Sequence, residues 1–273
     1  MARLRAAGCV YAEDEARLLV DAAGSQAELT ALVGRRVAGE PLEHLLGWAE
    51  FRGLRIAVDP GVFVPRRRTE LLVREALALL SGTAALRGTA PKQGGARAHG
   101  TPAHGTPVVV DLCCGSGAVG AAILEAAPQV SLVAADVDPA AVRCARRNVE
   151  PRGGHVVEGD LFAPLPPGLR GRVEVLVANA PYVPTDEIAL MPSEARSHEA
   201  QVALDGGRDG LEVVRRVLDG AAAWLAPGGH VLVESSTRQV PGAVDAVARA
   251  GLLARVATSA ELDATAVIGR RPR

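Results

Sequence analysis

Four residues at the end of an apolar segment could hold a planar nitrogen nucleophile. The segment Val175-Leu-Val-Ala-Asn-Ala-Pro-Tyr182 predicts a strand followed by Asn179, Ala180, Pro181 and Tyr182. A planar amide or exocyclic amine is a poor nucleophile because its lone pair is delocalised. The Asn179 carboxamide oxygen and a neighbouring backbone carbonyl could each accept one of its N–H bonds, turning the lone pair toward an electrophilic methyl group. The Tyr182 ring could pack on the planar group. The plainer alternative is a strand that ends in a Pro-Tyr turn.

A glycine-rich turn earlier in the chain could bind a cofactor. Residues 115–120 match the pattern G-x-G-x-x-G between a predicted strand and a predicted helix, where glycines allow a ligand close to the backbone. The next predicted strand ends at Asp136, which could bind ribose hydroxyls. These features fit either a nicotinamide dinucleotide or S-adenosylmethionine, and a turn without a ligand is the alternative.

Two further acids favour S-adenosylmethionine. Asp111, four residues before Gly115, suits a cationic amino-acid ligand and would repel a pyrophosphate. Asp160 could bind an adenine amino group while Leu161 covers the ring, although a turn or helix-capping role is equally open for Asp160. Asp111, Asp136, Asp160 and Asn179 follow four successive predicted strands, at the edge where open α/β sheets bind ligands. We therefore predict S-adenosylmethionine as the cofactor.

Alternating apolar patterns after residue 107 predict repeated strand–helix units. Strands are expected at residues 108–112, 131–136, 155–158, 173–178 and 230–234, and helices at 118–127, 139–149, 211–225 and 242–250. Residues 252–258 and 264–270 predict a closing hairpin. The pattern predicts an α/β protein with a largely parallel sheet, helices on both faces and an antiparallel addition from the hairpin.

The first 107 residues predict a smaller unit and a connecting segment. Helical periodicity covers residues 12–40, residues 51–64 are expected to be extended around a turn at Asp59-Pro60-Gly61, and residues 69–80 predict a helix capped by Thr69. Residues 81–107 have linker composition, so we expect disorder there. His99 and His104 could be imagined as metal ligands, but a low-complexity insertion is the better interpretation. The predicted division is 1–50, 51–80, 81–107 and 108–273.

Composition narrows the class of protein. The 273 residues are 48% apolar with a net charge of −1, which gives neither a nucleic-acid nor a membrane signature. The N-terminus lacks the apolar core of a signal peptide, and the four cysteines have no C-x-x-C spacing. We expect a cytoplasmic, monomeric protein with no metal site and no membrane partner.

At this point the chain resembles the glutamine-N5 methyltransferases that modify peptide-chain release factors. Besides Asn-x-Pro-Tyr, the likeness is carried by Gly39-Glu-Pro-Leu-Glu-His-Leu-Leu-Gly47, Phe51-Arg-Gly-Leu54, Pro60-Gly-Val-Phe-Val-Pro-Arg66 with Thr69-Glu70, and Leu204-Asp-Gly-Gly-Arg-Asp-Gly-Leu211. The resemblance implies the class I S-adenosylmethionine-dependent methyltransferase fold, which is Rossmann-like, with a small helical N-terminal domain. It also implies methylation of a protein glutamine, that of the Gly-Gly-Gln tip of a release factor.

The resemblance implies roles for particular residues. Asp136 would hold the ribose, Leu161 would cover adenine, and Asn179, beside the cofactor, would bind the glutamine amide together with the following carbonyl. Phe63 and Tyr182 would flank the substrate side chain, with core packing as their alternative. The loop that would wrap the methionine part of the cofactor consists of Cys113, Cys114, Gly115, Ser116 and Gly117.

The chain departs from the family pattern at several positions. Ala180 replaces the first proline of the motif, Cys113-Cys114 replaces the usual Gly and Thr, and Pro65-Arg-Arg-Arg-Thr-Glu70 carries extra charge. The helical N-terminal region is also shorter than usual, so we interpret the chain as a divergent paralogue. Three other functions stay open: nucleic-acid N-methylation, suggested by Arg66-Arg67-Arg68, a non-catalytic cofactor-binding module, and a nicotinamide dehydrogenase.

Overall fold

A seven-stranded sheet forms the centre of the computed structural model, which describes residues 1–87 and 105–273. The strand order is β5-β4-β3-β6-β7-β9-β8. Strands β3 to β7 are parallel, and β9 runs antiparallel to β7 and β8. The strands are β3 Val108–Leu112, β4 Ser131–Asp136, β5 His155–Glu158, β6 Val173–Ala178, β7 Leu225–Glu234, β8 Leu253–Ser259 and β9 Ala264–Arg270. The predicted parallel sheet and closing hairpin are confirmed.

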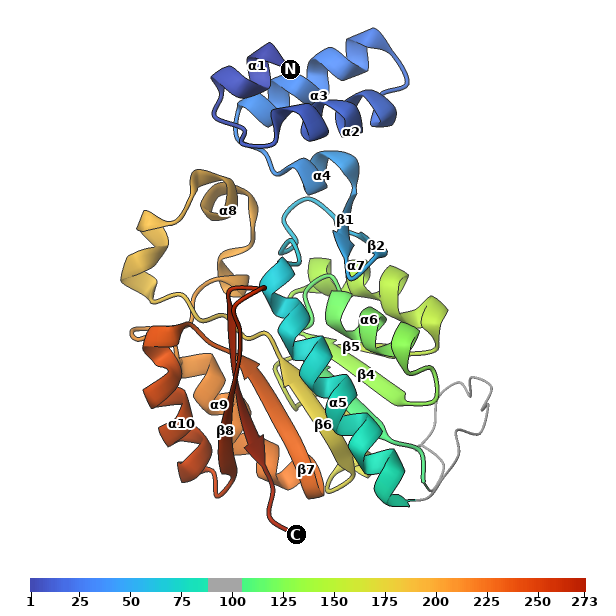
Figure 1. Cartoon of the computed structure of the whole chain (residues 1–273), viewed down its shortest axis with the longest axis vertical. Helices are drawn as coiled ribbons and strands as arrows, with labels where there is room; N and C mark the ends of the chain where they lie inside the picture. Colours follow the sequence, from blue (N-terminus) through green and yellow to red (C-terminus); the bar gives the residue numbers. More distant parts are fainter. Residues whose placement is uncertain (88–104) are drawn as a thin grey trace.

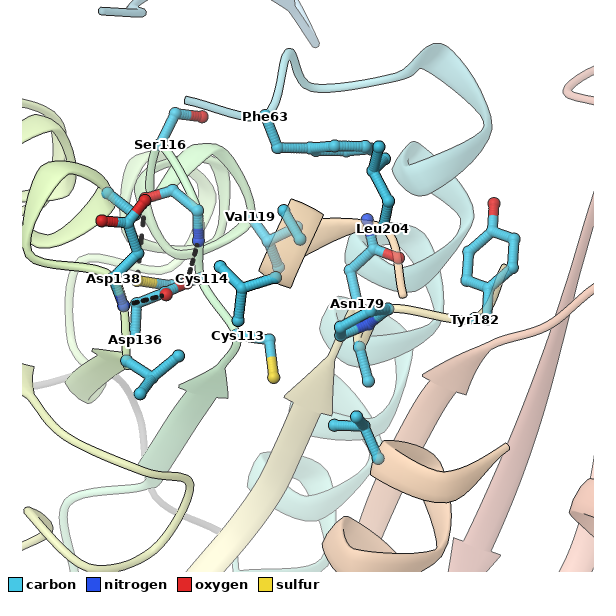
Figure 2. A pocket seen from close by; sticks show the side chains of 18 of the residues that line it. Phe63, Cys113, Cys114, Ser116, Val119, Asp136, Asp138, Asn179, Tyr182 and Leu204 are labelled. Carbon is cyan, nitrogen blue, oxygen red and sulfur yellow. Dashed lines mark hydrogen bonds between the residues drawn. The ribbon is translucent and has the colours of Figure 1, made fainter. Parts of the chain in front are cut away.

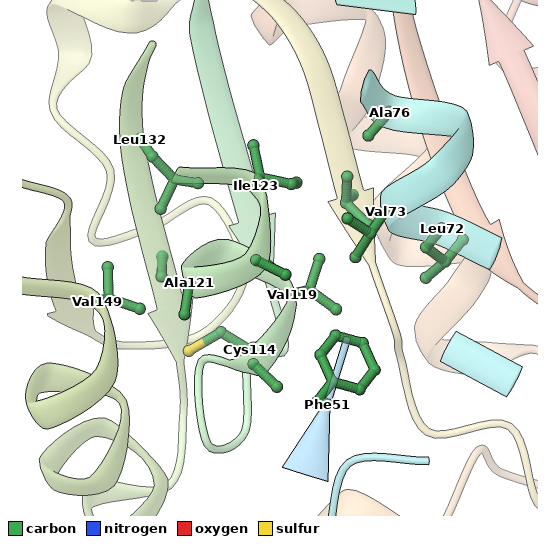
Figure 3. Close-up of a cluster of buried hydrophobic side chains, with 14 of the residues drawn as sticks. Phe51, Leu72, Val73, Ala76, Cys114, Val119, Ala121, Ile123, Leu132 and Val149 are labelled. Carbon is green, nitrogen blue, oxygen red and sulfur yellow. The ribbon is translucent and has the colours of Figure 1, made fainter. Parts of the chain in front are cut away.

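Helices cover both faces of the sheet (Figure 1). All residues of β3 and β6 are buried, as expected for central parallel strands. Alternate residues point to opposite faces, so Val109 packs with one set of helices and Val110 with the other. The first set is α5 Glu70–Arg87, α6 Ala118–Ala126 and α7 Pro139–Val149, and the second is α9 Glu212–Trp224 and α10 Val240–Arg249. Figure 3 shows part of the first cluster, including Val73 and Ile123.

The order of the strands places a topological switch point between β3 and β6. From β3 the sheet grows outward through β4 and β5, whereas β6 and β7 add to the other side of β3. The crevice at the carboxyl ends of two such strands is the usual ligand site of an open α/β sheet. Asp111 and Asn179 lie at or just beyond those ends.

The N-terminal helices have a small hydrophobic cluster of their own, formed around Leu4, Ala12, Leu19 and Leu32. The helices are α1 Ala2–Ala6, α2 Ala12–Ala22, α3 Gln26–Val37 and α4 Leu42–Leu46, and they stand away from the sheet (Figure 1). They lead into a hairpin of β1 Trp48–Phe51 and β2 Leu54–Ala57. Residue 50, where the first predicted segment ends, lies inside β1.

The predicted turn at residues 59–61 is present, because the Val62 N–H donates to the Asp59 carbonyl at 3.1 Å and Gly61 has a φ of +85°. The hairpin itself reverses at Arg52-Gly53, where both residues have positive φ, as in a type I′ turn, whose twist matches that of the strands. The prediction for Thr69 is wrong. Thr69 does not cap a helix but lies in the 3₁₀ turn η1 Arg67–Thr69, which leads into α5. That helix also continues to Arg87, since the Ala, Leu and Arg residues after position 83 favour helix.

The remainder of the predicted linker, residues 88–104 with His99 and His104, lies outside the described residues. The structure also has short helices that the sequence did not predict, above all in the segment after Tyr182. They are η4 Thr185–Leu190, α8 Ser193–His198 and η5 Gln201–Ala203, with further 3₁₀ turns at η2 Glu150–Arg152, η3 Pro167–Leu169 and η6 Thr237–Gln239. No helix in the described part of the chain is long and apolar enough to span a membrane.

Asn148 joins the hairpin to the sheet domain. Its Oδ1 accepts a hydrogen bond from the Ala57 N–H at 2.9 Å, and its Nδ2 donates to the carbonyls of Ala57 at 2.9 Å and Ser116 at 2.8 Å. The side chain is buried, so these groups have little access to water. The hairpin and the glycine-rich loop therefore both bind the side-chain amide of Asn148 in α7.

We expect Asn148→Ala to lower the free energy of unfolding by about 2–4 kcal/mol, because it leaves buried backbone groups without partners. Urea denaturation measures the change. The matched control is Arg146→Ala on the same helix, which removes an exposed side chain and should change stability by less than about 0.5 kcal/mol. Equal effects of the two substitutions would contradict the assigned role.

Candidate active site

A single cleft at the carboxyl edge of the sheet collects nearly all the residues predicted from the sequence. Its lining includes Phe63, Asp111, Cys113, Cys114, Gly115, Ser116, Asp136, Asp160, Leu161, Asn179, Ala180, Pro181 and Tyr182. Gly117 does not belong to the lining of the cleft. It is the N-cap residue of α6, with a φ of +76°, and a Cβ atom at this position would lie 2.8 Å from the Val149 side chain. Gly117 thus allows the loop to pack on α7.

The backbone N–H groups of the glycine-rich loop donate hydrogen bonds to β4. The Cys114 N–H donates to the Ala135 carbonyl at 3.1 Å, and the Gly115 N–H donates to Asp136 Oδ2 at 2.8 Å. Cys113 has a φ of +54°, a conformation that costs a residue with a Cβ more than it costs glycine. Burial raises the pKa of both cysteine thiols, so they remain protonated and poorly nucleophilic.

The floor of the cleft carries two carboxyl groups, of which Asp111 is buried and Asp136 is partly buried. Asp111 is 1% exposed, and its Oδ2 accepts a hydrogen bond from the Gly120 N–H at 2.9 Å. Burial raises the pKa of the Asp111 carboxyl to about 7. Asp136 Oδ1 accepts from the Asp138 N–H at 3.0 Å, and burial also raises the pKa of Asp136. A cation bound in this cleft would favour the ionised form of both groups.

Apolar side chains and an ion pair form the next part of the cleft. Val137 and Leu161 contribute apolar surface that suits a planar heterocycle, and Leu161 has a φ of +47°. Asp160 pairs with Arg216 of α9, with 2.5 Å between Oδ2 and the guanidinium. The acids and the apolar surface together fit S-adenosylmethionine, which combines a cationic sulfonium and ammonium with an adenine ring.

The other end of the cleft contains Asn179, just beyond the tip of β6 (Figure 2). Its Nδ2 lies 3.4 Å from Thr69 Oγ1, which sets the orientation of the carboxamide. Its Oδ1 is buried and accepts no hydrogen bond from any residue that the structure describes. A buried acceptor without a donor is costly and rare in folded proteins. This end of the cleft is therefore suited to a ligand that donates an N–H bond.

The aromatic side chains of Phe63 and Tyr182 lie near Asn179 in the cleft (Figure 2). An arginine lies over each ring. The Arg66 guanidinium carbon is 5.1 Å from the centre of the Phe63 ring, and that of Arg68 is 5.7 Å from the Tyr182 ring. The Tyr182 hydroxyl donates to Glu234 Oε1 at 3.1 Å. Burial, followed by the charge of Glu234, raises the pKa of Tyr182, so the phenol stays neutral.

Each of these arginines pairs with a buried glutamate. Arg66 lies 2.5 Å from Glu199 Oε1, and Arg68 lies 3.2 Å from Glu234 Oε1. The side chains of the two glutamates are 0% and 4% exposed. Arg67, by contrast, points to solvent with 72% of its side chain exposed. The run of three arginines therefore does not form a continuous basic surface.

Sequence reasoning missed Thr69 as the partner of Asn179, and it missed Glu199, Glu234 and Arg216. Glu234 ends β7 beside β6, so the strand-end rule that found Asn179 could also have found it. Glu199 follows α8 and meets Arg66 across 133 positions of the chain. No local pattern signals such a pairing.

Asp111→Asn should change how stability depends on pH. The folded pKa of about 7 lies above the ordinary value of 3.8, so this acid's contribution to stability is complete below pH 4 and is lost as the pH rises toward 7. The loss is about 1.4 kcal/mol per pH unit in that range. Asparagine keeps an acceptor for Gly120 but cannot ionise. Urea denaturation at pH 5 and pH 8 should show a larger fall for the wild type, and parallel falls would contradict this.

Comparison with known proteins agrees with this geometry. The model of the family "Methyltransferase small domain" matches residues 101–209. The release factor glutamine methyltransferase of Deinococcus radiodurans is 34% identical, with 93% of this chain and 90% of the relative covered. The 4-amino-L-phenylalanine/4-methylamino-L-phenylalanine methyltransferase of Streptomyces pristinaespiralis is 36% identical, with 76% of this chain and 65% of the relative covered.

A methyltransferase from Pyrococcus furiosus supports the fold alone: its structure is 16% identical, with a TM-score of 0.52, and 88% of this chain and 98% of that one are covered. The sheet order, the antiparallel end of the sheet and the strand-end cleft are those of a class I methyltransferase. Class I methyltransferases include many families, so the fold alone does not identify the family. The sequence identity to the Deinococcus relative, which extends over nearly its whole length, does identify it. The chain belongs to the release factor glutamine methyltransferase family.

Proposed function

We propose that this protein transfers a methyl group from S-adenosylmethionine to the side-chain nitrogen of a glutamine in a protein. The proposed substrate is the Gly-Gly-Gln glutamine of a peptide-chain release factor, and the proposed place is the cytoplasm, where such factors work. One observation supports the proposal: the buried Asn179 Oδ1 has no donor among the described residues, and Asn179 shares its cleft with the aromatic side chains of Phe63 and Tyr182. The names of the relatives support the choice of substrate.

The residues of this chain would position the reacting nitrogen. Asn179 Oδ1 accepts one N–H of the glutamine amide, and the Ala180 carbonyl accepts the other. Phe63 and Tyr182 restrict the plane of the amide. When S-adenosylmethionine is bound, it supplies an electrophilic methyl group. Positioning of this kind lowers a barrier by at most about 7–11 kcal/mol.

The proton balance needs no strong base. The amide nitrogen gains a methyl group and loses a proton, and that proton becomes acidic only as the new bond forms. Water can then accept it. Tyr182 would stay neutral throughout, because burial and Glu234 raise its pKa. The cofactor end of the cleft would bind through Asp111, the loop of residues 113–116, Asp136, Asp160 and Leu161.

A free aromatic amine is the second candidate substrate. The Streptomyces relative is named for a substrate with a nitrogen on an aromatic ring, and the same acceptor and aromatic walls would suit that group. Nucleic acid is less well supported, because Arg66 and Arg68 are each balanced by a buried glutamate. The substrate test therefore includes both a protein and a small molecule.

We expect labelled methyl to pass from S-adenosylmethionine to purified host release factor. A matched factor with its Gly-Gly-Gln glutamine replaced by alanine should remain unlabelled. 4-Amino-L-phenylalanine is assayed beside them under the same conditions. Labelling of the amine in place of the factor would overturn the protein substrate, and absence of any labelling would overturn the proposed activity.

Asn179→Ala should lower kcat by at least about 100-fold, because the nucleophile loses its orientation. The affinity for S-adenosylmethionine, measured by calorimetry, should be largely retained. Arg67→Ala is the control, since Arg67 borders the same region but its side chain points to solvent. A variant at Asn179 that keeps normal turnover would remove the residue from the mechanism.

A further inference from the structure

Glu199 provides a second buried acceptor in the cleft. Its side chain is fully buried, yet the residue contributes to the lining of the cleft. Its Oε1 accepts hydrogen bonds from the Val64 N–H at 3.2 Å and from Arg66 at 2.5 Å. Its Oε2 accepts none from any described residue. One oxygen of the carboxylate is thus fully used by the fold, and the other is not.

The structure holds this carboxylate in a fixed place. The next residue, Ala200, donates its N–H to the Gly61 carbonyl at 3.0 Å, so the backbone on both sides of Phe63 is tied to this segment. A rigid, buried oxygen cannot turn outward to find water without breaking these bonds. Leaving such an acceptor unpaired costs about 1–3 kcal/mol. The same cost would be recovered whenever a ligand donates a hydrogen bond to it.

The chemistry of a glutamine residue identifies the donor. If the proposed function is right, the side-chain amide of the substrate is already held by Asn179 Oδ1 and a backbone carbonyl. The other N–H group of the same residue is the one on its main chain. Arg66 balances the charge of Glu199, so the pair is neutral overall. A neutral pair suits a neutral peptide N–H better than it suits the ammonium group of a free amino acid.

We propose that Glu199 Oε2 binds the main-chain N–H of the glutamine residue whose side chain is methylated. The two buried acceptors then bind two parts of the same substrate glutamine: Asn179 binds its side chain, and Glu199 binds its backbone. Glu199 becomes a specificity residue that favours a peptide over a free amino acid. Glu234 has no equivalent role, because it does not line the cleft. Its Oε1 binds Tyr182 and Arg68 instead.

Glu199→Gln tests the proposal with little change in shape. Val64 and Arg66 both donate to Oε1, so they require an acceptor there and hold the amide oxygen in that place. The amide NH₂ group then replaces Oε2, and an acceptor becomes a donor. Binding of a Gly-Gly-Gln peptide is measured by calorimetry at pH 8 on protein loaded with S-adenosylhomocysteine. We expect the dissociation constant to rise 10- to 100-fold, with unchanged cofactor affinity and melting temperature.

The control variant is Glu194→Gln in α8, whose exposed side chain pairs with Arg36 outside the cleft. Its peptide affinity should stay within twofold of the wild type. If Glu199 only supported the Phe63 segment, Glu199→Gln would also bind normally, because both donors to Oε1 keep their acceptor. Peptide affinity within twofold of the wild type for Glu199→Gln would therefore overturn the proposal.

A change in the peptide tests the proposed hydrogen bond to Glu199 Oε2 by removing its donor. An ester in place of the amide at the glutamine nitrogen removes the proposed N–H, and an ester at the following residue is the matched control. The first ester should weaken binding to the wild type 10- to 100-fold but add little to the defect of Glu199→Gln. Equal penalties in the two proteins would contradict the bond.

The same calorimetry is done with free L-glutamine and 4-amino-L-phenylalanine. If either amino acid binds more tightly than the peptide, and if Glu199→Gln loses that binding, then Oε2 binds an ammonium group and the peptide preference is overturned. Failure of the wild type to bind any of these ligands would overturn the inference as well. Binding that depends on Glu199 without methyl transfer would instead overturn the proposed function and leave this inference standing.

Discussion

Four carboxyl groups around the cleft, three of them buried, join segments that are far apart in the chain. Asp111 connects β3 to α6, and Asp136 connects β4 to the glycine-rich loop. Glu199 connects the segment after α8 to residues 64–66, and Glu234 connects the end of β7 to Tyr182 and Arg68. Burying a carboxylate is unfavourable unless it gains strong hydrogen bonds. Each acid therefore fixes its donors in place, and the shape of the cleft follows from these bonds.

The same bonds separate the cleft into two chemical regions. Toward α6 and α7, the acids Asp111 and Asp136 have raised pKa values and favour a cationic ligand. Toward the N-terminal segment, Glu199 and Glu234 are balanced by arginines, so this region is close to neutral. A cationic cofactor and a neutral amide substrate match these two regions in that order. Asn179 lies in the second region, and its Oδ1, which has no donor among the residues that the structure describes, is the most specific feature there.

The departures from the family pattern change strain more than chemistry. Ala180 still offers the carbonyl that the proposed mechanism uses, and it is buried. Cys113 adopts a positive φ that glycine would adopt at lower cost, so this loop stores some strain. Of the two added arginines, Arg67 points to solvent, whereas Arg68 pairs with Glu234 and lies over the Tyr182 ring. Arg68 thus supports a wall of the cleft.

The sequence alone determined the sheet domain and most of the site. Strand and helix periodicity depends on neighbouring residues, so β3, β4, β5, β6, β9 and α7 were predicted with the bounds that the structure has. Asp111, Asp136, Asp160 and Asn179 could be grouped because parallel strands end at a common edge. The short helices after Tyr182 could not be predicted, because helices of so few residues are too short to be stable on their own and depend on tertiary contacts.

Only the tertiary structure decided what holds together the end of the cleft around Asn179. The Asn179–Thr69 contact spans 110 positions, and the Glu199–Arg66 pair spans 133. Hydrogen bonds between such distant residues leave no periodic pattern, since each partner is fixed by how whole segments pack. The sequence could identify Asn179 as an acceptor, but it could not show that Thr69 orients its amide or that Glu199 supplies a second acceptor. Those facts depend on burial, which removes water as the competing partner.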